Sequence, residues 1–333
     1  MILHPNILAL FMSSVLICLM TLYAAYHGVV ILRRWDITSG SESQLALERR
    51  TYLISTVLSY FIGFQLVSLF LFVQTADSIC HLFVGAMCAV GTLTANKFGY
   101  PTLLLKMLTF IMAGLWLILN HTDNQGYDYP LIRPKYFLLL VLAPFLLAET
   151  IVQGLYFARL QPDIITSCCG ALFSQASRGI ASEIIAAPSN IMKIIFYSCI
   201  TTMIMVGTRR YLKGKGSYLF AVVSGITFVV SIVSIISFIS LYFYEMPSHH
   251  CPFCILQKEY GYIGYPLYIL LFSGVVSGLG AGLLEPFRRK ESILDILPAV
   301  QRKLAAVSMA SFFIFSVIAT WQIAFSSFKL EGY

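Results

Sequence analysis

Charged residues are scarce in this chain. Asp, Glu, Lys and Arg together make up 11% of the 333 residues, whereas an average soluble domain contains about 25%. Hydrophobic residues make up 58%, and the mean hydropathy is +0.82. Polar side chains are too few to cover a sizeable soluble domain. The composition therefore predicts an all-α, polytopic membrane helical bundle in contact with lipid.

Motifs that would identify several classes of soluble protein are also missing. The sequence has no P-loop, no dinucleotide-binding fingerprint, and no Ser-His-Asp arrangement or carboxylate pair in a credible context. It has no Cys-x-x-Cys-His, which excludes a covalently attached c-type haem. The net charge is +7, but the basic residues lie in short segments between apolar runs, so no nucleic-acid partner is expected. No basic region precedes the first apolar run, so we expect this run to be retained as a span.

Eight apolar runs approach the roughly 20 residues needed to cross about 30 Å of hydrocarbon. A ninth, weaker run covers Ser78–Ala95. No repeat or linker divides the chain, so we expect a single integral membrane domain over residues 1–333. The eight predicted spans are Asn6–Leu32, Thr51–Thr75, Pro101–Asn120, Tyr136–Ala158, Asn190–Gly207, Ser217–Tyr244, Tyr265–Phe287 and Leu304–Phe328.

Basic segments predict the orientation, because loops rich in Lys and Arg stay in the cytoplasm. Five apolar runs separate the first two basic segments, and an even number is needed to place both on one side. We therefore expect Ser78–Ala95 to be a re-entrant or outer-face segment that does not cross. The result is eight spans in a bacterial inner membrane with both termini outside. The basic segments contain Arg33, Arg34, Arg49 and Arg50; Arg209, Arg210, Lys213 and Lys215; and Arg288, Arg289, Lys290, Arg302 and Lys303.

A Cys-x-x-Cys motif, Cys251–Cys254, lies between two predicted spans and on the predicted outer face. Two thiols at this spacing can cycle between dithiol and disulfide, form a structural disulfide, or hold a soft metal. A helix start predicted at the motif would favour the thiolate form of a cysteine. The preceding His249 and His250 would do the same if they carried positive charge.

The sequence Cys-Pro-Phe-Cys-Ile-Leu-Gln-Lys from Cys251 resembles the Cys-x-x-Cys-x-x-Gln-Arg motif of the DsbB family of quinone-reducing disulfide oxidases. The related vitamin K epoxide reductases use similar quinone-linked disulfide chemistry. The resemblance covers about Ser217–Phe287. It implies electron transfer from a periplasmic thioredoxin-like dithiol protein to membrane quinone, with Cys251 and Cys254 as the quinone-proximal pair. By the same resemblance, Gln257 and Lys258 would lie near the quinone, although Lys258 stands where the family has Arg.

The family's second cysteine pair lies downstream of the first, but no cysteine follows Cys254. A relay pair would therefore come from upstream, and the adjacent Cys168 and Cys169 are the candidates for a catalytic relay. Adjacent cysteines can form only a strained, labile disulfide, and they also suit Cu(I). Cys80 and Cys88 are either a further pair or small buried side chains.

Two other functions remain open at this point. A metal-handling membrane protein would bind copper, zinc or a similar ion. A non-catalytic electron-transfer or structural subunit would use its cysteines only as disulfides. The alternative metal ligands are Cys168, Cys169, Cys251, Cys254, His249 and His250.

Ionisable residues inside spans are costly and usually paired. We expect Lys106 and Glu149 to form an ion pair, with a proton path as the alternative, and Gln65 and Gln153 to line the same interior. His27 and His81 either form hydrogen bonds inside the bundle or are haem ligands. Four tyrosines are either interfacial aromatics or part of a quinone pocket: Tyr260, Tyr262, Tyr265 and Tyr268. Gly274, Gly278 and Gly282 recur at every fourth position and predict close helix packing.

The orientation can be tested by tagging and labelling. Tags at Gly214 and Glu291 should report a cytoplasmic location, and after reduction Cys251 and Cys254 should react with membrane-impermeant thiol reagents from the outside. Cys168 and Cys169 should behave in the same way. Labelling of Cys254 from the cytoplasmic side alone would show that the orientation is inverted.

Overall fold

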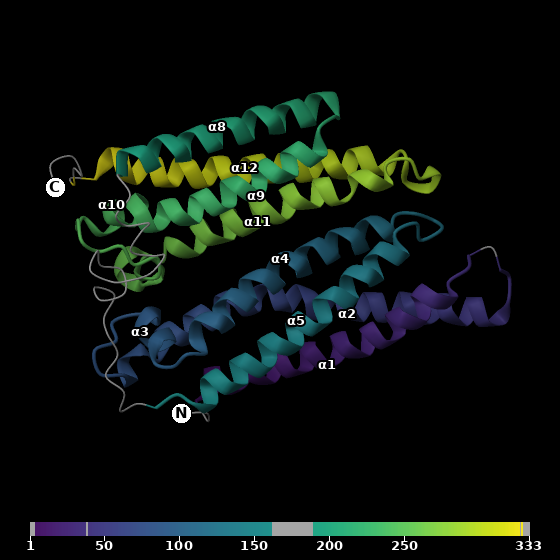
Figure 1. Ribbon diagram of the computed structural model, residues 1–333, viewed down its shortest axis with the longest axis horizontal. Coiled ribbons are helices and arrows are strands. Elements are labelled where there is room, and N and C mark those ends of the chain that lie inside the picture. Colours follow the sequence, from purple (N-terminus) through teal and green to yellow (C-terminus); the bar gives the residue numbers. More distant parts are fainter. Residues whose placement is uncertain (1–3, 38, 162–188, 327, 329–333) are drawn as a thin grey trace. The chain divides into compact units, whose positions relative to one another are not determined.

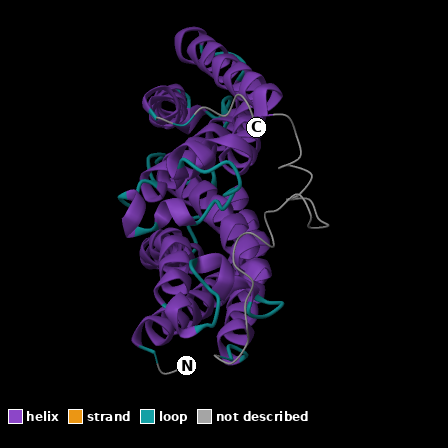
Figure 2. Cartoon of the chain, turned by 90° about the vertical axis from the view of Figure 1, so that its left-hand side faces the viewer, coloured by secondary structure: helices purple, strands orange, loops and turns teal. Residues whose placement is uncertain are grey.

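The computed structural model describes residues 4–37, 39–161, 189–326 and 328. These residues form helices and loops without a strand (Figure 2). Within them, eight helical segments are long and apolar enough to cross a membrane, which confirms the predicted all-α polytopic bundle. The long helices labelled in Figure 1 are α1 (Pro5–Arg34), α2 (Glu42–Ser78), α4 (Gly99–Asp123), α5 (Ile132–Ala158), α8 (Ser189–Lys213), α9 (Ser217–Ser234), α11 (Gly264–Leu283) and α12 (Ile296–Phe325).

The helix ends follow local chemistry. Pro5 stands in the first turn of α1, where its missing N–H is not needed, and Arg33 and Arg34 in the last turn complement the helix dipole. After α8, Gly214 and Gly216 both have positive φ angles, of 65° and 89°. Glycine adopts these angles without steric cost, so the chain turns directly into α9.

The segment Ser78–Ala95 contains no long helix. It forms a three-residue 3₁₀ turn, Cys80–Leu82, and the six-residue helix α3 (Ala89–Thr94). A spanning helix needs about 20 residues. The prediction that this run does not cross the membrane as a helix is therefore confirmed.

Contacts divide the chain into two compact units. The first comprises residues 1–75, 96–160 and 286–300, and the second comprises residues 76–95, 161–285 and 301–333. The first unit thus contains α1, α4, α5 and most of α2. The second contains α8, α9, α11 and most of α12. A single integral membrane domain over residues 1–333 stays a prediction.

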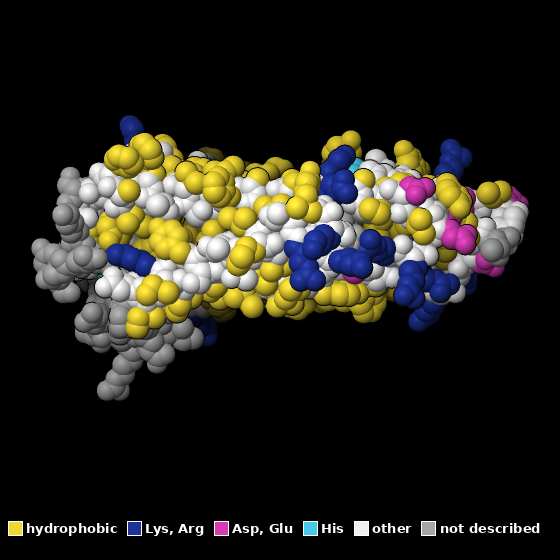
Figure 3. Space-filling view, turned by 90° about the horizontal axis from the view of Figure 1, so that it is seen from above, with side chains coloured by type: hydrophobic (Ala, Val, Ile, Leu, Met, Phe, Trp, Pro, Cys, Tyr) yellow, Lys and Arg dark blue, Asp and Glu magenta, His cyan; other side chains and the backbone are white. Residues whose placement is uncertain are grey.

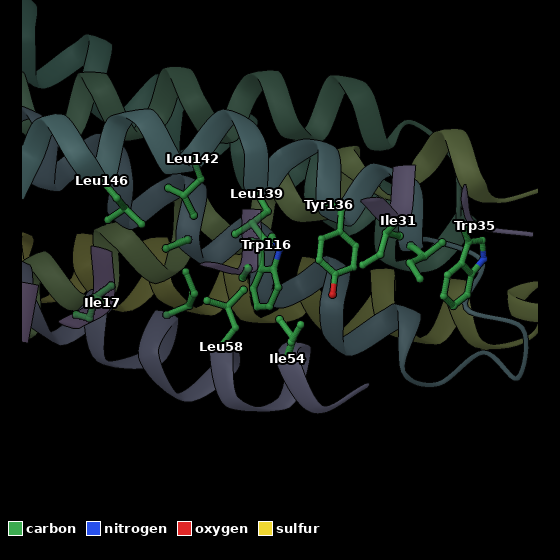
Figure 4. Close-up of a cluster of buried hydrophobic side chains, with 14 residues drawn as sticks. Ile17, Ile31, Trp35, Ile54, Leu58, Trp116, Tyr136, Leu139, Leu142 and Leu146 are labelled. Carbon is green, nitrogen blue, oxygen red and sulfur yellow. The ribbon is translucent and has the colours of Figure 1, made fainter. Parts of the chain in front are cut away.

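The core of the first unit is a cluster of aliphatic and aromatic side chains. Trp116 and Tyr136 are fully buried there, and Ile54 and Leu58 lie beside them (Figure 4). The Tyr136 hydroxyl is 3.0 Å from the hydroxyl of Ser55. Helices in lipid associate through close packing and interhelical hydrogen bonds, and this cluster supplies both.

A polar cluster lies inside the first unit. The Lys106 ammonium on α4 is 2.7 Å from a carboxylate oxygen of Glu149 on α5, and both side chains are almost completely buried. Lys106 also donates to the hydroxyl of Ser68 at 2.7 Å, while Gln65 donates to both Glu149 oxygens at 2.9 and 2.8 Å. Thr109 donates to the same carboxylate. The predicted ion pair is confirmed, and its hydrogen-bonded surroundings favour the structural interpretation.

Two other polar groups of the first unit have their own partners. Gln153 accepts a hydrogen bond from Ser14 at 3.2 Å. A second buried ion pair joins Lys135 to Asp123 at 2.5 Å, and Asp123 also accepts from the backbone N–H of Leu131. The Asp123 contacts hold the start of α5 against the end of α4.

Small residues set the packing of the second unit. A Cβ atom on Gly278 would lie 2.3 Å from the hydroxyl of Ser224 on α9, and one on Gly274 would lie 2.9 Å from the ring of Phe312 on α12. Neither distance is sterically acceptable, so α11 approaches both neighbours closely because it has glycine here. The predicted packing role of these glycines is confirmed.

The surface fits a lipid environment. Large apolar side chains such as Ile194, Val222 and Phe313 are exposed. On the face shown in Figure 3, hydrophobic side chains cover much of the surface, while most Lys and Arg side chains gather toward one end. This separation is typical of membrane proteins with basic loops on one side.

The buried ion pair of the first unit can be tested by a double-mutant cycle. Glu149→Gln should destabilise the protein by about 3–5 kcal/mol, because it leaves the Lys106 charge buried without its counter-ion. Adding Lys106→Met should restore part of the loss. The measurement is unfolding of the full chain in detergent, with Glu42→Gln at an exposed position as the control. Additive effects of the two substitutions would show that the charges are not coupled.

Candidate functional site

Three cysteines from two loops of the second unit meet at one place. Cys88 directly precedes α3, and Cys251 and Cys254 lie in the loop between α10 (Ser240–Tyr244) and α11. Their three sulfur atoms lie within 4.8 Å of one another, and the sulfurs of Cys88 and Cys251 are 3.8 Å apart. The exposed fractions of the three residues are 0%, 0% and 5%. We call this group the three-cysteine cluster.

Two tyrosines fix the backbone of the Cys-x-x-Cys loop. The hydroxyl of Tyr244, at the end of α10, donates to the carbonyl of Cys251 at 2.5 Å and accepts from the N–H of Ile255 at 2.9 Å. The hydroxyl of Tyr268, on α11, donates to the carbonyl of Pro252 at 2.7 Å. The helices on both sides of the loop thus hold the motif in place, and Tyr268 acts here as a structural anchor.

A side-chain amide joins this loop to the loop that carries Cys88. Gln257 donates from Nε2 to the Asp77 carboxylate at 3.0 Å and to the carbonyl of Met87 at 2.9 Å. Asp77 also accepts from the N–H of Ala89 at 3.1 Å. These bonds bracket Cys88 and place it against the motif. The Gln257 amide is thus engaged between two loops, and Lys258 is exposed.

The prediction that a helix starts at the Cys-x-x-Cys motif is wrong. Cys254 begins only a three-residue 3₁₀ turn, and α11 starts at Gly264. Gly261 and Tyr262 have positive φ angles of 63° and 57°, which no α-helix accommodates. The motif therefore gains no stabilisation of a thiolate from a long helix. A Cβ on Gly264 would lie 2.9 Å from the backbone of Ile255, so glycine here lets α11 pass close to the motif.

The two histidines before the motif have defined partners. The ring of His249 packs edge-on against Tyr244 at 4.5 Å, and Nδ1 of His250 lies 3.0 Å from the carbonyl of Ile236. Burial lowers the pKa of both imidazoles below their ordinary value. Burial thus favours the neutral form of both imidazoles over the charged form that would support a thiolate.

The other predicted site residues lie elsewhere. Cys168 and Cys169 fall outside the described residues. Cys80 is half-buried, and His81 next to it is exposed. In the first unit, His27 packs against the rings of Tyr23 and Tyr26 at 4.7 and 5.4 Å. Among the described residues, Cys80, His81 and His27 do not belong to the three-cysteine cluster.

Sequence reasoning identified the Cys-x-x-Cys motif but missed three parts of the site. It treated Cys88 as a partner for Cys80 or as a small core residue, and it did not consider Asp77 or Tyr244. One signal was present: Asp77 is an acidic residue at the end of a long apolar run, where an unpaired carboxylate is costly. A search for its partner would have pointed to a donor in another loop.

Comparisons of the chain with family models, curated proteins and solved structures found no match. The fold and the site define the protein as a polytopic membrane protein whose described residues form a buried three-cysteine cluster. Its function is inferred from the chemistry that this cluster permits.

The buried state of His250 predicts a pH effect on stability. Its folded-state pKa lies below the ordinary value of 6.5, so its contribution to stability is complete above that value and is lost as the pH falls. Between about pH 7.5 and about pH 5, the melting temperature of wild type should fall more than that of His250→Gln. His81→Gln, at an exposed histidine, is the control and should keep the wild-type slope. Equal slopes for all three proteins would contradict the assignment.

Proposed function

We propose that the protein is a membrane thiol–disulfide oxidoreductase in which Cys251 and Cys254 form the redox pair and Cys88 is the third participating thiol. The main support for this proposal is that the three sulfur atoms lie within 4.8 Å of one another, with the sulfurs of Cys88 and Cys251 3.8 Å apart. A disulfide requires two sulfurs that approach to about 2.05 Å. Small side-chain rotations can bring either partner to Cys251.

The exchange proceeds through a mixed disulfide. A thiolate of a partner protein attacks the sulfur of Cys251 in the Cys251–Cys254 disulfide, and Cys254 leaves as a thiolate. A second thiolate of the partner then attacks the mixed disulfide, so that the partner is oxidised and the pair is reduced. The same steps run in reverse when the partner is a disulfide.

Membrane quinone would take up the electrons, as the resemblance to the DsbB family implies. Two thiols and one quinone give one disulfide and one quinol, so two electrons and two protons move together. Cys251 and Cys254 are buried, so the attack of a partner protein on Cys251 requires movement of the loop that carries the motif. Cys88 contacts Cys251 from a different loop, and we assign it the role of a second thiol that can resolve a mixed disulfide at Cys251.

Electrostatics favours thiol exchange over a permanent metal site. Three thiolates around one divalent ion leave a net negative charge in a buried place, and Asp77 lies close enough to Cys88 to add to it. Burial lowers the pKa of both neighbouring histidines, which disfavours the positive charge that would offset the thiolates. A cycle between thiols and a disulfide requires no buried net charge in either resting state.

Metal handling is the second candidate, because three converging sulfurs also suit a soft ion such as Cu(I) or zinc. Its ligands would be Cys88, Cys251 and Cys254. This set differs from the one expected from the sequence, because His250 is engaged with the carbonyl of Ile236.

Serine substitutions separate the two candidates. In Cys254→Ser, the proposed function predicts that Cys88 resolves part of the mixed disulfide at Cys251, giving a Cys88–Cys251 disulfide. In Cys88→Ser/Cys254→Ser, both resolving thiols are gone, and the mixed disulfide that forms when the Cys251 thiolate attacks the disulfide of the oxidised partner should accumulate several-fold more. Non-reducing electrophoresis and mass spectrometry of native membranes measure both products, and Cys199→Ser is the control.

Metal handling predicts a different pattern for the same variants. Serine at any of the three positions would lower the bound metal of the purified protein to a similar extent, and no mixed disulfide would accumulate. A loss of stability with neither product nor metal would indicate a structural disulfide, which would refute both candidates.

A further inference from the structure

A pocket lies where α1 ends and α2 begins. Its volume is about 400 Å³, and all of its lining residues belong to the first unit. Arg34, the last residue of α1, and Arg50, in the third turn of α2, both line it. Three serine hydroxyls and the amide of Gln44 complete its polar wall. A hollow that combines positive charge with hydrogen-bond donors favours an anion.

The Gln44 side chain is the most informative part of the pocket. Its exposed fraction is only 5%, and its Oε1 accepts a hydrogen bond from the N–H of Asp36 at 3.3 Å. This bond identifies the oxygen of the amide and leaves the NH₂ group for another partner. Among the described residues, none accepts a hydrogen bond from Nε2. A buried donor without a partner is costly, so the amide indicates an acceptor inside the pocket.

The start of α2 adds positive potential to the same place. Ser41 caps this helix, because its hydroxyl accepts from the N–H of Gln44 at 3.3 Å. The hydroxyls of Ser39 and Ser43 lie 3.1 and 3.0 Å from that of Ser41. The N-terminus of a long helix carries a partial positive charge and favours anions. This potential reinforces the charge of the two arginines.

The balance of charges limits the kind of anion. In the part of the chain that the structure describes, neither Arg34 nor Arg50 forms an ion pair. Asp36 also lines the pocket, so two arginines and one aspartate leave one net positive charge. A phosphodiester carries one negative charge, and its oxygens match the fork of N–H donors on a guanidinium group. The lining therefore fits a phosphodiester.

The apolar part of the pocket favours a lipid over a free phosphate. Val30, Ala46 and Leu47 line it beside the polar groups, and the two helices that meet here are apolar enough to cross a membrane. Basic residues at the ends of such helices lie at the level of the lipid headgroups. A phospholipid would place its phosphate on the arginines and its glycerol and first acyl carbons on the apolar side chains. An inorganic phosphate would leave these side chains without a contact.

We propose that this pocket binds the headgroup of one anionic phospholipid. Arg34 and Arg50 contact the oxygens of the phosphodiester, and Nε2 of Gln44 donates a hydrogen bond to one of them. The turn that carries the site is held by Trp35, whose buried side chain belongs to the core of the first unit. The site involves none of the cysteines, so it goes beyond the proposed function and is tested independently of it.

Native mass spectrometry of the delipidated full chain in detergent tests the proposal, with phosphatidylglycerol as the probe. One phosphatidylglycerol molecule should bind to the wild-type protein. Arg34→Gln and Arg50→Gln should each weaken its binding by about tenfold, the loss expected for one hydrogen bond to a charged group. Arg33→Gln is the matched control, since Arg33 is exposed and adjacent to Arg34 but does not line the pocket. It should bind the lipid as the wild-type protein does.

A Gln44→Glu variant tests the role of the amide. It keeps an oxygen for the N–H of Asp36 but replaces the NH₂ donor with a negative oxygen, so it should weaken binding at least as much as Arg34→Gln. If this variant is not recovered folded, the two exposed arginines decide the question.

Two further probes identify the source of the phosphate. Diacylglycerol, which lacks the phosphate, should bind more weakly than phosphatidylglycerol, and inorganic phosphate should not displace the bound lipid. Displacement would assign the site to free phosphate and overturn the proposal. Equal binding of diacylglycerol, equal weakening in Arg33→Gln, or no retained phosphatidylglycerol would overturn it as well.

Discussion

The site depends on the hydrogen bonds of one side-chain amide. Gln257 joins the Cys-x-x-Cys loop to Asp77 and to the carbonyl of Met87, so that Cys88 lies against Cys251. The other anchors, from Tyr244 and Tyr268, fix only the motif itself.

Each unit of the protein handles buried polarity in a different way. In the first unit, Lys106 and Glu149 neutralise each other, and neighbouring hydroxyl and amide groups complete their hydrogen bonds. Such an arrangement is rigid and has no obvious need for exchange with water. In the second unit, three buried cysteines converge from two loops, and hydrogen bonds from tyrosine and glutamine side chains hold both loops in place.

The sequence was sufficient to predict the spans, because apolar runs of about 20 residues are a strong and local signal. The absence of a spanning helix in Ser78–Ala95 was also predictable, because an even number of spans must separate two basic segments that lie on the same side of the membrane. The partner of Cys251 was not, since it lies 163 residues away in the chain and the contact arises from side-chain bonds that leave no periodic pattern. The predicted helix start at the motif failed for a local reason, namely the left-handed conformations of Gly261 and Tyr262.

The central claim is that the three-cysteine cluster exchanges electrons as a dithiol–disulfide couple. The most direct test is an equilibrium redox titration of the purified wild-type protein, in which mass spectrometry identifies every disulfide at each potential. The account predicts one two-electron transition. In the oxidised form Cys251 is joined to Cys254 or to Cys88, and in the reduced form, after denaturation, the two cysteines of that disulfide react with an alkylating reagent. Cysteines that remain fully reduced at every potential, or that are protected throughout by a bound metal ion, would contradict it.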